Sequence, residues 1–337
     1  MTEQVTKGVV LQDSLGRVAS KLRISVTDRC NFRCNFCMPE DPSWLPRKEI
    51  LSFEEITRVT RVLASIGIHK IRLSGGEPLM RRGVEKLVNM LVQVPGIEDV
   101  SMTTNGMMLA DRISLLKRSG LNGVTVSLHS MKAERFESIT GTRNTFERVL
   151  QGIQSAKDAG LKVKINTVTI RDCNEDEILD FANLAYYGNV TVRFIEYMPF
   201  DGKKLWGMEK VFSGRSIIDR ISTKFSLTKC LREPGSTAET YSFAEGSTGE
   251  ISIITSMTKP FCADCDRVRL KADGKLVPCL FSSDEYDLRP LLRRSGSDQE
   301  LSKFICESYL KKSPGIETIL KEKRLVQHIR PMHTIGG

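Results

Sequence analysis

Short apolar, β-branched segments alternate with amphipathic segments from residue 22 to about 196, and this alternation is what most constrains the fold. Strands alternating with helices form parallel βα units. Six such units are too few for a closed eightfold barrel and favour an incomplete (β/α)6 barrel, with a doubly wound open sheet as the alternative. The expected strands are Leu22–Thr27, Lys70–Leu73, Asp99–Thr104, Gly123–Leu128, Leu161–Ile170 and Val190–Ile195. The expected helices lie near 53–66, 84–93, 110–118, 145–159 and 175–187.

The pattern changes beyond about residue 200. Glu250–Thr255 has the composition of a lone strand, and helical character returns after residue 298. We therefore expect a partial barrel over residues 1–235 and a smaller α+β domain over residues 236–337. Near the start of the barrel, Ser52 and Glu55 have the spacing of a capping box and predict that a helix begins at Phe53.

Composition limits the classes of function. The 337 residues contain no apolar run long enough to predict a membrane span, and the N-terminus has no signal core. We expect a cytoplasmic protein, or an organelle-matrix protein in processed form. The net charge is +9, yet no basic run or aromatic-basic interleaving marks a nucleic-acid surface. The positive charge suits a small polyanion such as a nucleoside triphosphate.

Cys30, Cys34 and Cys37 form a C-x3-C-x2-C triplet directly after the first strand. Because [4Fe–4S] clusters normally take four cysteine ligands, three thiolates leave one iron open to a small molecule. Structural zinc sites are closed by four ligands, and no histidine lies near this triplet. The triplet favours an iron–sulfur cluster, with zinc as the alternative.

Cys262, Cys265 and Cys279 form a second triplet, C-x2-C-x13-C, without a nearby fourth ligand. By itself this spacing is also compatible with an incomplete zinc ribbon. Beside the first triplet it favours a second cluster with an open iron. Arg267 and Arg269 follow at once and are suited to anionic groups.

Further polar signals come after the expected strands, at the carboxyl ends where βα barrels build their sites. Gly75-Gly76-Glu77 follows the second strand, Ser127 ends the fourth, and Met198 follows the sixth. The glycine pair is either an ordinary turn or a place where a ligand approaches backbone amides. In the second case Glu77 would receive the ligand's ammonium group.

Several strands also carry cations on one face, by the period of two. Arg23 shares its face with Ser25, Arg72 belongs to the second strand, and Lys164 to the fifth. An unpaired buried charge is costly. These cations therefore either pair with interior carboxylates such as Glu77 or Glu196, or bind an anionic ligand.

The paired motifs resemble a known family. A C-x3-C-x2-C triplet after the first strand with Gly-Gly-Glu after the second is similar to the radical S-adenosylmethionine (SAM) signature. The second triplet, its Arg-Val-Arg continuation and the terminal Ile335-Gly336-Gly337 resemble the GTP 3′,8-cyclase (molybdenum cofactor biosynthesis protein A) family. The resemblance extends from Gly16-Arg17 to the last residue.

The resemblance implies site residues. It implies two [4Fe–4S] clusters, one on Cys30, Cys34 and Cys37 and the other on Cys262, Cys265 and Cys279. For SAM it implies Phe36, Gly76, Glu77, Ser127 and Met198. For GTP it implies Arg23, Arg72, Thr103, Lys164, Arg193, Arg267, Val268 and Arg269. Of these, Arg23, Arg267 and Arg269 are expected in the catalytic site, together with Gly336 and Gly337 of a tail that reaches into the pocket. Asp266 stands where the family more often has asparagine, and pairing with Arg267 or Arg269 would weaken GTP binding.

The resemblance also implies the reaction: radical SAM cyclisation of GTP to 3′,8-cyclo-7,8-dihydro-GTP, in molybdenum cofactor biosynthesis. The implied partners are an external one-electron donor of the flavodoxin or ferredoxin type and cyclic pyranopterin monophosphate synthase downstream, with a homodimer left open. No nucleic acid or membrane is expected as a partner. Two alternatives are a radical SAM peptide-modifying enzyme with an auxiliary cluster, which typically needs more C-terminal cysteines, and a zinc protein that binds nucleic acid.

Overall fold

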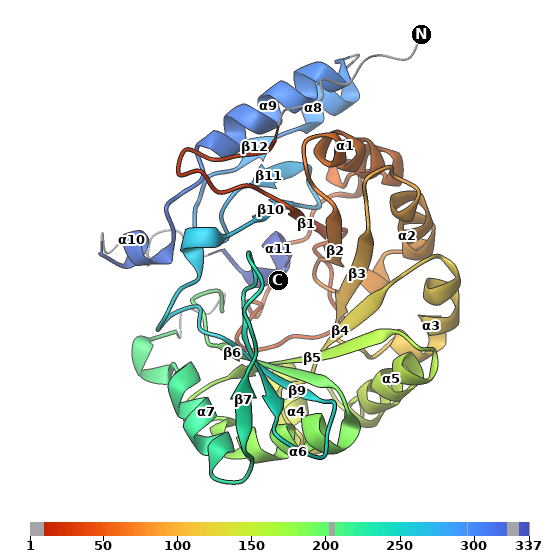
Figure 1. Cartoon of the computed structure of the whole chain (residues 1–337). Helices are drawn as coiled ribbons and strands as arrows, with labels where there is room; N and C mark the ends of the chain where they lie inside the picture. Colours follow the sequence, from red (N-terminus) through yellow and green to blue (C-terminus); the bar gives the residue numbers. More distant parts are fainter. Residues whose placement is uncertain (1–9, 202–205, 295, 322–329, 337) are drawn as a thin grey trace.

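The computed structural model describes residues 10–201, 206–294, 296–321 and 330–336. Twelve strands in this part of the chain form one curved sheet, in the order β12-β11-β10-β1-β2-β3-β4-β5-β6-β9-β8-β7 (Figure 1). The first six are β1 (Lys21–Ser25), β2 (Lys70–Ser74), β3 (Asp99–Thr104), β4 (Gly123–Ser127), β5 (Lys162–Thr169) and β6 (Thr191–Glu196). The others are β7 (Leu227–Lys229), β8 (Glu239–Phe243), β9 (Glu250–Ile254), β10 (Arg267–Leu270), β11 (Lys275–Val277) and β12 (Tyr286–Asp287).

Strands β1 to β6 are parallel neighbours in sequence order. This order lacks the reversal of a doubly wound sheet, so the incomplete barrel is confirmed and the doubly wound alternative is wrong. Two later strands extend the barrel, because β9 pairs parallel to β6 and β10 pairs parallel to β1. The prediction that Glu250–Thr255 is a lone strand is also wrong. β9 lies between β6 and β8, and apolar periodicity does not show which strands will pair.

The helices expected in the barrel occur within a few residues of their predicted bounds, as α1 (Phe53–Ser65), α2 (Val84–Val92), α3 (Leu109–Arg118), α5 (Phe146–Asp158) and α6 (Ile178–Gly188). The capping box of α1 is present, with Ser52 accepting from the Glu55 amide and Glu55 accepting from the Ser52 amide. The unforeseen helices are α4 (Ala133–Thr140), α7 (Gly214–Ser222) and α8 (Arg289–Arg293). The chain ends with α9 (Asp298–Leu310), α10 (Ile316–Lys321) and α11 (Met332–Ile335). Short 3-10 turns are η1 (Arg47–Glu49), η2 (Pro78–Met80), η3 (Glu175–Glu177), η4 (Met208–Lys210) and η5 (Cys262–Asp264).

The main apolar core lies between the sheet and the helices around it. Leu22, Ile24, Ile71 and Leu73 are fully buried in this core. Each such side chain contributes about 1.5–3 kcal/mol of hydrophobic stabilisation. The residues that alternate with them, including Arg23 and Arg72, therefore face the concave side of the sheet.

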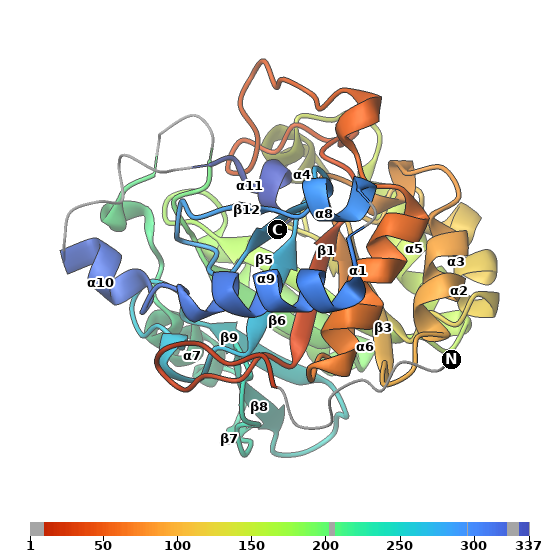
Figure 2. The same cartoon turned by 90° about the horizontal axis from the view of Figure 1, so that it is seen from above.

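The C-terminal segment returns to the barrel in two places. Helix α9 packs beside α1, where Arg58 Nε lies 2.7 Å from Asp298 Oδ1 (Figure 2). Helix α11 lies within the curve of the sheet (Figure 1). Strands from both sides of residue 235 share one sheet, and the expected domain boundary there remains a prediction. Within the described ranges, no helix is both long enough and apolar enough to cross a membrane.

Candidate active site

The first cysteine triplet lies on the loop that leaves β1. The loop turns at Cys34, whose carbonyl accepts the amide of Cys37 at 3.1 Å. Cys30 Sγ accepts the Phe32 amide at 3.4 Å and lies 3.9 Å from Asn105 Nδ2. Burial, with the charge of Glu77, raises the pKa of Cys30 to about 11, and burial beside Cys30 raises that of Cys37 to about 12.

The glycine pair after β2 fits against this cysteine loop. A Cβ on Gly75 would lie 2.4 Å from the Thr27 carbonyl oxygen, and one on Gly76 would lie 2.4 Å from that of Arg29. The Gly76 amide donates to Thr27 and the Glu77 amide to Arg29, both at 2.8 Å. The expectation that a ligand approaches these amides is therefore wrong for Gly76 and Glu77. The glycines let the cysteine loop itself come close.

Glu77 is fully buried beneath the loop. Its carboxylate accepts from the Leu79 amide at 3.0 Å, the Asn105 amide at 2.7 Å and the Thr104 hydroxyl at 2.7 Å. Burial still dominates and raises its pKa to about 7. An ammonium group nearby would favour the charged form, so the site suits a cationic ligand atom.

Two of the expected SAM residues, Ser127 and Met198, lie at the ends of β4 and β6. Ser127, at the end of β4, pairs with Asn166 on β5. The buried Asn166 Oδ1 has no hydrogen-bond partner among the described residues. Buried acceptors in native proteins almost always have a partner, so an unsatisfied one indicates a place where a ligand or water binds. Met198 follows β6 and packs with a small apolar cluster that includes Cys262.

His129 was assigned no role from the sequence, but it contacts Phe36. The two ring centroids are 4.7 Å apart in an edge-to-face arrangement. Its Nδ1 accepts the Val168 amide at 3.1 Å, and burial lowers the pKa of His129 to about 4. Neutral His129 therefore fixes the ring of Phe36. No sequence pattern indicated this contact.

The second triplet is assembled from the segments around β10 and β11. Cys262 is the first residue of η5, Cys265 follows η5 just before β10, and Cys279 follows β11. Burial would raise the pKa of Cys265, but Arg267 and Lys312 lower it to about 6. Lys312 Nζ lies 3.5 Å from Cys265 Sγ, and Arg267 Nη2 lies 3.6 Å from it.

A row of cations lines the concave face between the two cysteine sites. Arg269, Arg23 and Arg72 stand at one register level on β10, β1 and β2. Burial and repulsion from Arg269 and Arg72 hold the pKa of Arg23 well below its ordinary value. Burial and the same kind of repulsion lower the pKa of Arg193 to about 9 and that of Arg269 to about 10.

The other expected GTP residues lie around this row. Thr103 stands on β3 opposite Thr125 of β4, whose hydroxyl accepts from Arg72 at 2.8 Å. Lys164 on β5 is in register with Thr125 and remains exposed. Val268 is fully buried in the core on the opposite face of β10, which leaves only its backbone for a ligand.

The interior carboxylates do not neutralise these cations. Glu77 is held as described above, and Glu196 accepts the amides of Gly214, Met257 and Thr258 at 2.8, 2.9 and 2.9 Å. Within the described ranges, none of Arg23, Arg72, Lys164, Arg193, Arg267 and Arg269 forms an ion pair. The buried Arg267 Nε also lacks a hydrogen-bond partner there. Of the two readings of the cations, pairing with Glu77 or Glu196 is wrong.

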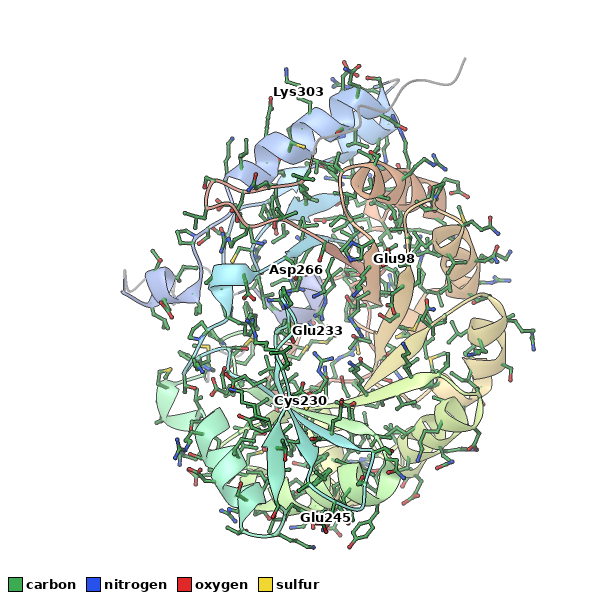
Figure 3. The ribbon with its side chains drawn as sticks, viewed as in Figure 1. Glu98, Cys230, Glu233, Glu245, Asp266 and Lys303 are labelled. Carbon is green, nitrogen blue, oxygen red and sulfur yellow. The ribbon has the colours of Figure 1, made fainter. Side chains whose placement is uncertain are left out.

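Asp266 does not pair with the arginines that follow it. It directly precedes β10 (Figure 3). Its carboxylate lies 2.9 Å from Lys21 Nζ and accepts the Ser20 hydroxyl at 2.5 Å. The period of two points its side chain away from those of Arg267 and Arg269. Aspartate at this position thus leaves both guanidinium groups free.

The chain end lies between the two cysteine sites. The Gly336 carbonyl accepts from Arg269 Nη1 at 3.1 Å, and a Cβ on Gly336 would lie 2.8 Å from Ser74 Oγ. The His333 amide donates to Cys37, and the His333 ring packs against Trp44 at 5.8 Å. Gly336 therefore lies beside Arg269 and Ser74, its role in the site stays a prediction, and Gly337 is outside the described residues.

Both cysteine sets fit the clusters that the motifs imply. In each set the thiols affect one another's pKa, which requires that they lie close together. Three thiolates per set leave an iron of a [4Fe–4S] cluster open. Among the described residues, the buried Asn166 Oδ1 and Arg267 Nε have no hydrogen-bond partner and are therefore available to a ligand.

The chain is similar to known proteins over nearly its whole length. The profile of the Radical SAM superfamily matches residues 24–185, and that of Molybdenum Cofactor Synthesis C matches residues 190–318. A GTP 3′,8-cyclase of Pelotomaculum thermopropionicum is 43% identical, over 97% of this chain and 100% of that protein. A GTP 3′,8-cyclase of Aquifex aeolicus is 38% identical, with the same coverage. A mitochondrial GTP 3′,8-cyclase of Arabidopsis thaliana is also 38% identical, over 97% of this chain and 84% of that protein.

Solved structures support the fold. The SAM-bound SuiB of Streptococcus suis superimposes with a TM-score of 0.60 and 15% identity, over 94% of this chain and 78% of SuiB. At this identity the likeness concerns the fold alone.

Proposed function

This chain belongs to the GTP 3′,8-cyclase family of the radical SAM superfamily, and on that premise we propose the roles of its residues in the cyclisation of GTP. The product is (8S)-3′,8-cyclo-7,8-dihydroguanosine 5′-triphosphate, the first intermediate of molybdenum cofactor biosynthesis. One observation carries the assignment of substrate: the row of cations between the two cysteine sites, which have no ion-pair partners among the described residues. A peptide substrate would not need such a row, so the peptide-modifying alternative has less support.

Cys30, Cys34 and Cys37 would hold the cluster that binds SAM, and Cys262, Cys265 and Cys279 the cluster that meets the guanine ring. When bound and reduced, the first cluster supplies the electron that cleaves SAM and so starts hydrogen abstraction at C3′ of GTP. Glu77, buried and with a pKa near 7, accepts the methionyl ammonium group. Phe36, held by His129, offers an apolar face to the adenine.

The cations position the substrate. Arg23, Arg72 and Arg269 offer guanidinium groups at one level of the barrel, which suits phosphate oxygens. Lys164 and Arg193 extend the same surface across β5 and β6. Arg267, whose Nε lacks a partner in the described part of the chain, donates towards the substrate near the second cysteine set. Gly336 closes the space between the sites and excludes water from the reacting atoms.

The remaining partners follow from the chemistry. The reaction needs a one-electron donor of the flavodoxin or ferredoxin type, and its product is the substrate of cyclic pyranopterin monophosphate synthase. We also propose a cytoplasmic location, or an organelle matrix as in the mitochondrial relative, and a homodimer as the form to test by light scattering.

Anaerobic reconstitution tests the proposal. Protein with about eight irons, for two four-iron clusters, is incubated with SAM, GTP and dithionite. The expected products are 5′-deoxyadenosine and cyclised GTP in equal amounts. Protein that carries both clusters and yields neither product would contradict the assignment.

A further inference from the structure

Lys312 reaches the second cysteine site from the turn between α9 and α10. Its side chain is 3% exposed. The ammonium group donates to the carbonyls of Cys265 at 2.9 Å and Arg267 at 3.0 Å, and to the Tyr309 hydroxyl at 2.8 Å. It also lies 3.5 Å from Cys265 Sγ. Four contacts from one ammonium group fix the backbone on both sides of Asp266 and the sulfur of one predicted cluster ligand.

This ammonium group has no carboxylate partner among the described residues, since none of their ion pairs includes Lys312. A buried cation without a counter-ion is strongly unfavourable. The nearest group that can be negative is the thiolate of Cys265. The charge of Lys312 is therefore balanced only when that sulfur is ionised, as it is in a metal-bound thiolate.

A second buried cation at this site provides a contrast. Arg17 donates to the carbonyls of Cys262 at 2.9 Å and Ser313 at 2.8 Å. Its Nε lies 2.5 Å from Asp13 Oδ2, so its charge is already paired. Arg17 thus fixes the loop without adding net charge, whereas Lys312 adds a positive charge beside the sulfur.

We propose that Lys312 is a positioning residue of the second cluster: it fixes Cys265 and raises the reduction potential of the cluster by placing a buried positive charge beside one of its thiolate ligands. This inference rests on the proposed function only in requiring that Cys262, Cys265 and Cys279 bind a cluster. Groups that surround a metal ligand tune its potential through charge and hydrogen bonds. Reduction adds a negative charge, and a nearby buried cation stabilises the reduced form.

Burial separates Lys312 from Arg267, the other cation beside this sulfur. Arg267 also acts on Cys265, but it is only partly buried, and its guanidinium group lies 4.8 Å from the Phe261 ring centroid. Lys312 is the more enclosed of the two cations, so solvent and salt screen its charge less.

The test uses the full chain with Cys30, Cys34 and Cys37 replaced by serine, so that only the second cluster is present. Lys312→Met removes the charge at similar length, Lys312→Arg keeps it, and Tyr309→Phe removes one contact of the ammonium group while leaving the charge. Iron content and the midpoint potential, from an anaerobic titration followed by electron paramagnetic resonance, are measured for each. For Lys312→Met we expect the potential to fall by about 59 mV, a tenfold change in the one-electron equilibrium. Lys312→Arg and Tyr309→Phe should stay close to the parent.

Each other outcome is decisive. A Lys312→Met protein with about four irons and the parent potential would overturn the proposal. So would loss of the cluster from both Lys312→Met and Lys312→Arg, because that would show a requirement for shape rather than charge. Loss of the cluster from Lys312→Met but not from Lys312→Arg would support the proposal, because it shows that the cluster requires a positive charge at this position. If Lys312→Met does not fold by circular dichroism, Lys312→Gln, which keeps a donor for the carbonyls, replaces it under the same criteria.

The measurement is independent of turnover. If the wild-type protein binds both clusters and fails to cyclise GTP, the proposed function fails and the effect of Lys312 can still be measured. If the second cysteine set binds no iron in wild-type protein, the inference and the second-cluster assignment fail together, while SAM cleavage by the first cluster remains testable.

Discussion

The two cysteine sites each hold three thiols, but the dominant charges beside Cys30 and Cys265 are opposite. At the first, burial and neighbouring negative groups raise the pKa of Cys30 to about 11. At the second, Arg267 and Lys312 overcome burial and lower the pKa of Cys265 to about 6. The first site therefore relies on the charge of bound iron to ionise its thiols, whereas the second already contains cations.

The two sites also differ in how the chain builds them. The first is one loop of eight residues after β1, held in place by the Gly75-Gly76 turn. The second depends on β10, β11, the turn after α9 and the N-terminal residue Arg17. The comparison teaches that the first site is a local structure and the second is a product of the whole fold.

Replacing single ligands should separate the sites most strongly. Cys34→Ala should abolish both 5′-deoxyadenosine and cyclised GTP, because SAM loses its iron. Cys265→Ala should abolish cyclised GTP while some SAM cleavage continues at the intact first site. Chromatography of both products measures this, and Cys306→Ala, remote from both triplets in sequence, is the control. Equal loss of 5′-deoxyadenosine in the two ligand variants would remove the distinction.

The chain end should couple the two sites. Gly336 has a φ of +80°, and an added Cβ would lie 2.8 Å from Ser74 Oγ and 3.0 Å from Ser25 Cβ. Gly336→Ala should displace the end and lower cyclisation at least tenfold, the scale of about 1–3 kcal/mol of local strain. Iron content should not change. Gly160→Ala is the matched control, since Gly160 has a φ of +68° and no neighbour within 4 Å of an added Cβ. A fully active Gly336→Ala protein would show that the end is not needed there.

The cations between the sites should strengthen GTP binding and lower the stability of the ligand-free protein. Arg23→Met should weaken GTP binding by about 3 kcal/mol, roughly a hundredfold in Kd. The same change should stabilise the ligand-free protein by about 1 kcal/mol, because an unpaired cation is removed. Calorimetry and urea unfolding measure the two effects. Lys303→Met, on the exposed outer side of α9, is the control (Figure 3). A destabilised Arg23→Met protein would contradict the view that this cation is uncompensated.

Acid should affect the second site through Glu285, which pairs with Lys271 and Lys275, each at 2.9 Å, and with Arg330. Burial would raise the pKa of Glu285, but these cations lower it to about 2, from an ordinary value of 4.5. A carboxyl group with a lowered pKa stabilises the fold above its unfolded pKa, and this contribution is lost as the pH falls from 4.5 towards 2. After solvent screening we expect a loss of about 1 kcal/mol.

Urea unfolding of the ligand-free protein at pH 5 and pH 3 measures this loss, which Glu285→Gln should reduce. Glu54→Gln, at the exposed start of α1, serves as the control because Glu54 forms no ion pair within the described ranges. If the free energy of unfolding falls equally in wild type and Glu285→Gln between pH 5 and pH 3, Glu285 does not cause the loss.

Much of the barrel could be predicted from the sequence because its signals are local. The period of two in β1 and β2 distinguishes buried Leu22 and Ile71 from the cations Arg23 and Arg72, and the capping box fixes the start of α1. Partners across the sheet could not be predicted. β9 was taken for a lone strand, and β10 gave no sign that it would pair with β1, because pairing depends on which edges the fold leaves free.

The candidate site divides in the same way. The cysteine spacings and the cations were visible in the sequence, and the resemblance gave them roles. The contacts of Lys312 with Cys265 and of His129 with Phe36 were not visible in the sequence, because no regular spacing relates these residues. The close contact of the glycine pair with the cysteine loop could not be predicted either, because that loop comes from an earlier segment of the chain.

The sequence by itself determined the two three-thiol sets, the parallel βα units and the excess of positive charge, because each depends on residue type and short-range periodicity. Only the tertiary structure decided that the cations have no ion-pair partner among the described residues, that Asp266 turns to Lys21, and that Arg267 and a lysine from the turn after α9, Lys312, lower the pKa of Cys265. The physical reason is that electrostatic energy depends on distances and burial, and these are set when remote segments pack against each other.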